Sequence, residues 1–176
     1  MKRLIIITLV LVAMTGCRHK QTQNAQNAQA TQTAQTDELT TGEQMLQMLN
    51  QQSLSLLVYN DTTLTTHDNR GIHDLLQLLA EQPERLKGAI VADKLVGKAA
   101  AAIMATGGVA EVHTNIISTP ARELLEKEGV RVFANEEVPQ ILNRDRSGMC
   151  PIDTQIAGVE SIDECVKILQ QLPVRP

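Results

Sequence analysis

The chain has very few aromatic residues: its 176 residues include no tryptophan, one tyrosine and one phenylalanine. Because Tyr59 and Phe133 stand alone, side-chain stacking platforms for nucleobases or sugar rings are almost unavailable. Positive charge is scarce as well, since 20 acidic residues outnumber 16 basic ones. Such a balance lacks the basic footprint that binding to a phosphate backbone requires. We therefore exclude nucleic acid as a partner and expect backbone and charged groups to hold any ligand.

Long apolar runs are also rare, and the main one lies at the N-terminus, over residues 4–13. It follows two basic residues, ends at Met14-Thr15-Gly16-Cys17, and is too short to cross a bilayer as a helix. This pattern is typical of a secretion signal closed by a lipoprotein box, residues 1–17. We predict that Cys17 becomes the first mature residue and carries lipid, which contributes roughly 0.8 kcal/mol per buried methylene. The alternative for Cys17 is an ordinary apolar core thiol.

Arg18 follows the predicted lipidation cysteine where an aspartate would retain a lipoprotein in the inner membrane. In a two-membrane bacterium this residue favours an outer-membrane anchor that faces the periplasm. Residues 21–36 are only Gln, Thr, Asn and Ala, a composition that cannot bury a core. We interpret residues 18–37 as a flexible tether that spans about 25 Å. A minority interpretation is an assembly-promoting Gln/Asn tract.

Residues 38–176 have the length of one domain, enough to close a hydrophobic core. Apolar periodicity and turn residues predict alternating helices and strands along this domain. The predicted helices cover residues 43–51, 72–81, 94–105, 120–128 and 162–172, and the predicted strands cover 53–59, 62–66, 87–92, 109–117 and 130–134. The order of helix, hairpin and then βα units predicts an α/β fold in which a mixed sheet lies between helical layers.

Polar residues follow the predicted strand over 87–92, where an α/β sheet opens a crevice. Asp93 is predicted at the strand-to-helix junction, where its carboxylate would cap free amides. Lys94 and Lys98 would then lie one helical turn apart, and Gly97 would allow close backbone approach. The alternative is a capped helix with two solvated lysines. A nucleotide phosphate loop does not fit, because glycine and Ser/Thr are missing at the required positions.

A second polar segment runs from Asn143 to Pro151 and contains the most reactive candidate of the domain, Cys150. Nearby arginines, among them Arg144, would lower the pKa of a thiol, which makes Cys150 a candidate nucleophile. The alternative is a turn that packs under the sheet edge. Cys165 lies at helical spacing with apolar residues and is expected to be buried. An oxidising envelope would also permit Cys150 and Cys165 to pair.

Three short motifs resemble a known group of proteins. They are Arg70-Gly71-Ile72, the run Ala92–Ala100, and Ile141–Asp145 followed by Met149-Cys150-Pro151. Together they resemble a small prokaryotic domain family of unknown function with a cytidine-deaminase-like fold, over residues 43–172. The resemblance implies a three-layer α/β/α sandwich and no established activity.

The zinc motif of working deaminases is missing from the chain. These enzymes need His or Cys two residues before Glu at one helix start and Pro-Cys-x-x-Cys at the next. Here the corresponding positions read Gly71–Asp74 and Asp93-Lys94, so three thiolate or imidazole ligands are not available. We therefore expect neither a catalytic metal nor another cofactor.

Our first functional hypothesis is a membrane-anchored lipoprotein whose deaminase-like domain binds a small anionic or nucleotide-like ligand. The ligand would be neutralised by Lys94, Lys98 and Arg144. Asp93 and Asn143 would orient it, and Asp93 and Cys150 are the candidates for any chemistry. The predicted ligand-binding residues are Asp93, Lys94, Gly97, Lys98, Asn143, Arg144, Asp145 and Cys150. The second hypothesis is a non-catalytic envelope lipoprotein that serves protein–protein contacts. The sequence does not decide between enzyme and binding protein, nor does it give an oligomeric state.

Overall fold

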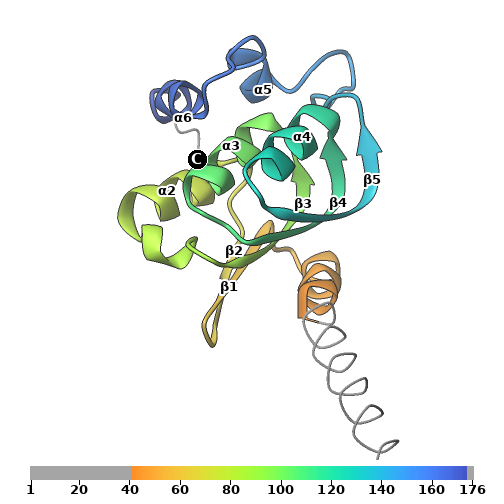
Figure 1. Cartoon of the computed structure of the whole chain (residues 1–176). Helices are drawn as coiled ribbons and strands as arrows, with labels where there is room; N and C mark the ends of the chain where they lie inside the picture. Colours follow the sequence, from red (N-terminus) through yellow and green to blue (C-terminus); the bar gives the residue numbers. More distant parts are fainter. Residues whose placement is uncertain (1–40, 174–176) are drawn as a thin grey trace, which may run out of the picture. The chain divides into compact units, whose positions relative to one another are not determined.

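A computed structural model describes residues 41–173, all within the unit Glu38–Pro176. The predicted signal peptide, Cys17 and the tether lie outside the described residues. The described part contains a five-stranded sheet in the order β2-β1-β3-β4-β5 (Figure 1). β1 (Leu56–Asn60) pairs antiparallel with β2 (Thr63–His67) and β3 (Ile90–Val96). β4 (Glu111–Ser118) and β5 (Arg131–Val138) continue the sheet in parallel with β3, so the sheet is mixed as predicted.

Local sequence explains the hairpin and the two βαβ units. β1 and β2 pair from Leu56↔His67 to Asn60↔Thr63, and Asp61 supplies the positive φ of 55° that a two-residue turn needs. α3 (Lys98–Thr106) connects β3 to β4, and α4 (Thr119–Lys127) connects β4 to β5. α2 (His73–Glu81) and a 3-10 turn, η1 (Pro83–Arg85), lie between the hairpin and β3.

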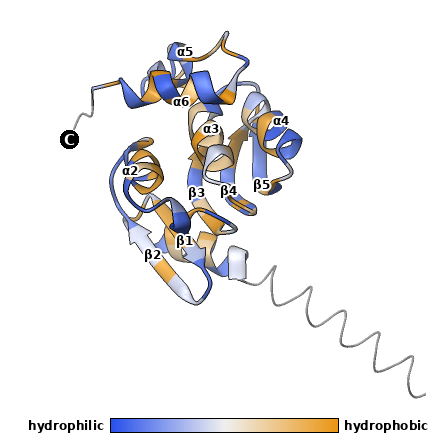
Figure 2. Ribbon diagram, turned by 60° about the vertical axis from the view of Figure 1, so that its left-hand side comes forward, coloured by the Kyte–Doolittle hydropathy of each residue, from blue (hydrophilic) through white to orange (hydrophobic). Residues whose placement is uncertain are grey.

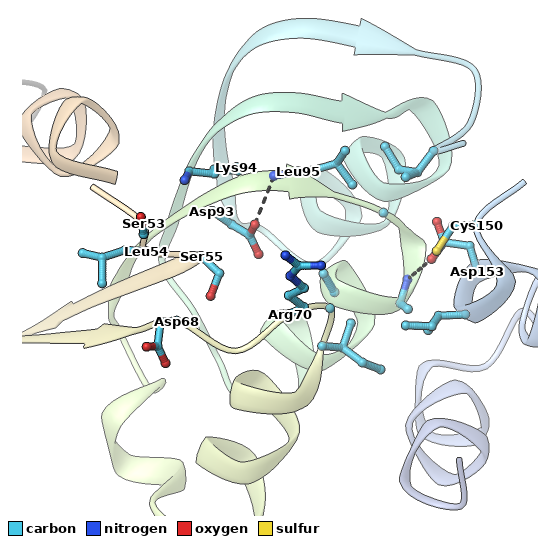
Figure 3. A pocket seen from close by; sticks show the side chains of 17 residues that line it. Ser53, Leu54, Ser55, Asp68, Arg70, Asp93, Lys94, Leu95, Cys150 and Asp153 are labelled. Atoms are coloured by element: carbon cyan, nitrogen blue, oxygen red, sulfur yellow. Dashed lines mark hydrogen bonds between the residues drawn. The ribbon is translucent and has the colours of Figure 1, made fainter. Parts of the chain in front are cut away.

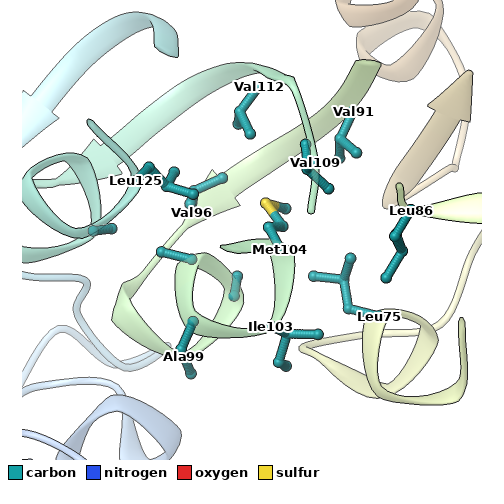
Figure 4. Packing of buried hydrophobic residues seen from close by; sticks show 14 of the residues in the cluster. Leu75, Leu86, Val91, Val96, Ala99, Ile103, Met104, Val109, Val112 and Leu125 are labelled. Carbon is teal, nitrogen blue, oxygen red and sulfur yellow. The ribbon is translucent and has the colours of Figure 1, made fainter. Parts of the chain in front are cut away.

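Alternation along the strands places two apolar clusters on opposite faces of the sheet. Val91 and Val112 belong to the larger cluster, which Leu75 of α2, Met104 of α3 and Leu125 of α4 complete (Figure 4). Leu57 and Ala92 point to the other face, where they meet the helix over residues 41–51. The sheet therefore lies between helices on both faces, consistent with the predicted three-layer sandwich.

The helices differ in how much of their surface is buried. Residues Ala99–Met104 of α3 are all buried, so this helix is surrounded by protein, and Figure 2 shows its apolar colouring. α6 (Ile162–Gln170) packs on α3 through Cys165, Val166 and Leu169 and has polar residues on its other side. A short helix that the sequence did not predict, α5 (Pro151–Gln155), precedes it.

One predicted boundary was wrong in a way that matters for the site. The strand predicted to end at Ala92 continues to Val96, because Leu95 and Val96 extend the parallel ladder to Ile116 and Ile117 of β4. Helix α3 begins only at Lys98. Asp93 and Lys94 are therefore strand residues, so Asp93 does not cap α3, and Lys94 and Lys98 are not one helical turn apart.

The predicted strand over 130–134 also continues further, to Val138, because Glu136 and Glu137 pair with Ile116 and Ile117 of β4. β5 is an edge strand, which tolerates charged residues that a central strand would exclude. No helix of the described part is both long and apolar enough to cross a membrane.

Candidate functional site

A cavity of about 370 Å³ opens where the carboxyl end of β3 meets the β2–α2 loop and α5 (Figure 3). The segment before β1 contributes Ser53 and Ser55, and the β2–α2 loop contributes Asp68 and Arg70. The same two segments also contribute Leu54, Gly71 and Ile72. The remaining lining residues come from β3, the start of α3 and the segment 141–153, namely Asp93, Lys94, Leu95, Gly97, Ala99, Ala100, Ile141, Cys150, Ile152 and Asp153. Of the predicted ligand-binding residues, the cavity thus brings together Asp93, Lys94, Gly97 and Cys150.

Asp93 is the most perturbed ionisable group of the cavity. Its side chain is half-buried, and its Oδ1 accepts a hydrogen bond of 3.0 Å from the Leu95 amide. Burial raises the pKa of Asp93 from 3.8 to about 7, although hydrogen bonds from the Leu95 and Lys94 amides act in the opposite direction. No cation of the described residues forms a salt bridge with this carboxyl group. Asp93 therefore changes charge near neutral pH.

Arg70 is a cavity cation that sequence analysis did not include among the site residues. It lies in the loop between β2 and α2, next to Gly71, whose φ of 73° shapes the turn. Its guanidinium makes no hydrogen bond or ion pair with any residue in the range 41–173, and Figure 3 shows it pointing into the cavity. The signal was present in the Arg70-Gly71-Ile72 motif, but only the fold shows that this loop reaches β3.

Lys94 lines the edge of the cavity rather than its centre. Figure 3 shows its side chain directed away from Asp93, toward the segment that contains Ser53. Its Nζ donates to the Gln52 carbonyl at 3.3 Å. One of the three ammonium hydrogens is thus used, which leaves Lys94 able to interact with a ligand at the cavity edge.

Asp153 performs the capping role that the sequence assigned to Asp93. It lies on α5, is 7% exposed, and its Oδ1 accepts from the Ala99 amide at 2.9 Å. A Cβ on Gly97 would collide with this carboxylate, so only glycine allows the approach. Burial raises the pKa of Asp153, against the opposing effect of the Ala99 and Lys98 amides and the Lys98 charge. The N-terminus of α3 is therefore occupied by the protein's own carboxyl group.

Lys98 is not a cavity cation. Its Nζ donates to the carbonyl oxygens of Val159 at 2.7 Å and Ile156 at 3.0 Å, with a longer contact to Ala157. These carbonyls follow α5, so Lys98 fastens this segment to the start of α3. The predicted role of Lys98 in neutralising a ligand is replaced by a structural one.

The predicted loop residues Asn143, Arg144 and Asp145 also lie outside the cavity lining. Asn143 donates to Ser147 Oγ at 3.0 Å and accepts from the Gly148 amide at 3.2 Å. Hydrogen bonds from Ser147 hold the pKa of Asp145 below its usual value. Asn143 and Asp145 stabilise their own turn, and Arg144 is exposed to solvent outside the cavity.

The two cysteines differ as predicted in their surroundings. Cys165 is 1% exposed and belongs to the main core, so the buried assignment is confirmed. Cys150 is half-buried, lines the cavity, and precedes α5, where its carbonyl accepts from the amide and hydroxyl of Thr154. Both are free thiols.

A second hollow of about 300 Å³ lies beside the 41–51 helix and is lined by His113 and Phe133, whose rings stack at 4.7 Å. His113 contacts the buried carboxylate of Glu111 at 2.5 Å, and Arg131 reaches the same carboxylate at 2.6 Å. Because the buried His113 of this hollow already has Glu111 as its partner, the hollow is a weaker candidate for ligand binding than the first cavity. Within residues 41–173, no three His, Cys, Asp or Glu side chains are arranged to hold a metal ion.

Comparison with known proteins identifies the family of this chain. A family model described as "Domain of unknown function (DUF1893)" matches residues 44–172. The chain belongs to the DUF1893 family. It is similar to the crystal structure of a DUF1893 family protein from Thermotoga maritima, with 27% sequence identity and a TM-score of 0.66. The similarity covers 73% of this chain and 86% of that one, and no curated protein matches. The predicted membership of a family of unknown function is thus confirmed.

Proposed function

We propose that this DUF1893 protein is a lipid-anchored binding protein of the bacterial envelope whose cavity holds a small ligand with an anionic group. Arg70 carries the proposal, because it points into the cavity without a partner among the described residues. An arginine fork suits carboxylate or phosphate oxygens, which it can bind through two parallel hydrogen bonds. Lys94 at the cavity edge adds a second positive charge.

In this proposal Arg70 replaces two cations, Lys98 and Arg144, that the sequence analysis expected to bind the ligand. Lys98 is used by main-chain carbonyls and Arg144 lies outside the cavity, so Arg70 takes over the anion-binding role. A nucleotide-like ligand is less well supported than a simple anion, because neither aromatic residue of the chain lines this cavity. Asp93 and Cys150 remain the candidates for any chemistry on the bound molecule.

The proposal includes two parts that rest on sequence. We infer a cytidine-deaminase-like architecture without the zinc motif, supported by the mixed sheet between helices and by the element order. We also infer that lipid on Cys17 anchors the domain to the outer membrane, facing the periplasm. Metabolic labelling with an alkyne fatty acid tests the anchor: the native chain should be labelled and sediment with membranes. Cys17→Ser should lose both properties, and a soluble, unlabelled native chain would contradict the anchor.

Thermal-shift titration of the full-length chain in detergent tests ligand binding. A panel of small carboxylates, phosphates and sugar phosphates should contain a compound that raises the melting temperature. Arg70→Gln should abolish that shift, whereas Arg85→Gln, which removes an arginine from η1 outside the cavity, should not. Arg144→Gln separates the site predicted from the sequence from the site seen in the structure. The sequence-based site predicts weaker binding in this variant, whereas the structure predicts unchanged binding. Shifts that persist in Arg70→Gln would contradict the proposal.

A further inference from the structure

The cavity presents charges of both signs that do not neutralise one another. Asp68 and Asp93 line it together with Arg70, and no salt bridge joins any two of them. Figure 3 shows Arg70 and Asp93 on different segments, both directed into the same space. With Asp153 also in the lining, carboxyl groups outnumber the two cations. A multiply charged anion such as phosphate would meet these carboxyl groups, which disfavour it by like-charge repulsion.

Aliphatic side chains form a further part of the cavity wall. Ile141 and Ile152 come from the C-terminal part of the chain, and Ala99 and Ala100 come from the first turn of α3. These side chains favour a compact aliphatic body over a flat ring. The volume of about 370 Å³ lies near the lower end of the range of small-molecule sites, which limits the occupant to a small metabolite.

We propose that the ligand is a small aliphatic zwitterion, of the class of free aliphatic α-amino acids. This inference rests on the proposed function, since it uses Arg70 for the ligand carboxylate. Asp93 receives the ammonium group, because its carboxyl accepts only main-chain hydrogen bonds and retains free lone pairs. The aliphatic side chain of the ligand packs on Ile141 and Ile152.

Binding of such a zwitterion should depend on pH through Asp93. The ammonium group requires Asp93 to be ionised, whereas the pKa of Asp93 in the free protein is about 7. The other charged or titratable groups in the cavity lining are Asp68, Arg70, Lys94, Cys150 and Asp153. Affinity should therefore fall by about tenfold per pH unit below the pKa of Asp93 and level off above it. Asp93→Asn should remove this dependence.

Isothermal titration of the full-length chain at pH 8 tests the ligand class with four probes. They are L-leucine, its deaminated analogue 4-methylvalerate, its decarboxylated analogue isoamylamine, and inorganic phosphate. We expect leucine to bind about 10- to 100-fold more tightly than either single-charge analogue, the value of one charge-assisted hydrogen-bonded pair. Asp93→Asn should weaken leucine binding by a similar factor without weakening the binding of 4-methylvalerate. Arg70→Gln should weaken both.

The outcomes separate this inference from the function on which it rests. If 4-methylvalerate or phosphate binds as tightly as leucine and still requires Arg70, the anion-binding function stands and the zwitterion is wrong. If leucine binding is unchanged in Asp93→Asn, the ammonium assignment is wrong. If no probe binds, or binding is indifferent to Arg70→Gln, both proposals fail.

Discussion

Replacing Asp93 with asparagine should stabilise the protein, and the gain should grow with pH. The folded protein holds a proton on Asp93 up to a pKa of about 7, whereas the unfolded chain releases it near 3.8. Below about pH 4 Asp93 is protonated in both states and does not lower the free energy of unfolding. Between pH 4 and 7 the folded state binds more protons than the unfolded chain, so the free energy of unfolding falls as the pH rises. Asparagine preserves the shape and the oxygen that accepts from the Leu95 amide, but never ionises.

The magnitude follows from the shift of the pKa. A shift of about three units at roughly 1.4 kcal/mol per unit sets an upper limit of about 4 kcal/mol. Because Asp93 is only half-buried, water in the cavity reduces the effect, and we expect roughly 2 to 4 kcal/mol.

Urea denaturation of the native chain and Asp93→Asn at several pH values between 4.5 and 8 measures this effect. The difference in unfolding free energy should be small at the acid end, increase toward pH 7 and then remain constant. Asp153 also has a raised pKa, but it is present in both proteins and cancels in the comparison. Glu123→Gln on the exposed face of α4 is the control and should show no such trend. A difference that does not vary with pH would refute the raised pKa of Asp93.

Three further changes test contacts around the site and on the opposite face. Gly97→Ala should destabilise the fold by about 1–3 kcal/mol in urea denaturation, because the new methyl collides with the Asp153 carboxylate. Lys98→Met should cost about 2 kcal/mol and increase protease cleavage after α5, because main-chain carbonyls lose their donor; unchanged cleavage would contradict this. Glu111→Gln should cost about 1–2 kcal/mol by loss of charged contacts, limited because Arg131 is 55% exposed and can be solvated by water; circular-dichroism melting measures it.

The sequence predicted the fold well where a segment is periodic and bounded by turn residues. The hairpin was recognisable because Asn60-Asp61 separates two β-rich runs, and α6 because its apolar residues recur at helical spacing. Boundaries failed where partners decide them. β3 continues through Asp93 and Lys94 because β4 supplies a ladder, although charged residues suggest a strand end. α5 was missed because five residues give too little periodicity.

The candidate site was predictable only in part, for a related reason. Asp93, Lys94, Gly97 and Cys150 do line one cavity, as their place near a strand end suggested. Arg70 was missed because its loop lies far from β3 in the sequence and reaches it only through the fold. Side-chain direction was beyond the sequence as well: spacing indicates that a lysine is present, and tertiary contacts decide whether its ammonium group faces solvent, carbonyls or a ligand.

The contact between Asp153 and the start of α3 argues against a phosphate cradle at Gly97-Lys98, in agreement with the missing phosphate-loop pattern. A helix N-terminus following a glycine is a common anion site, because its free amides and dipole favour negative charge. Here that site is already filled by a buried carboxyl group, and the adjacent lysine is used by carbonyls. We therefore expect an anion in the cavity to be recognised by Arg70, which lies in the β2–α2 loop and has no partner among the described residues. In the proposed binding mode, the internal carboxyl group thereby moves the recognition of negative charge from main-chain amides to side chains, namely Arg70 and, at the cavity edge, Lys94.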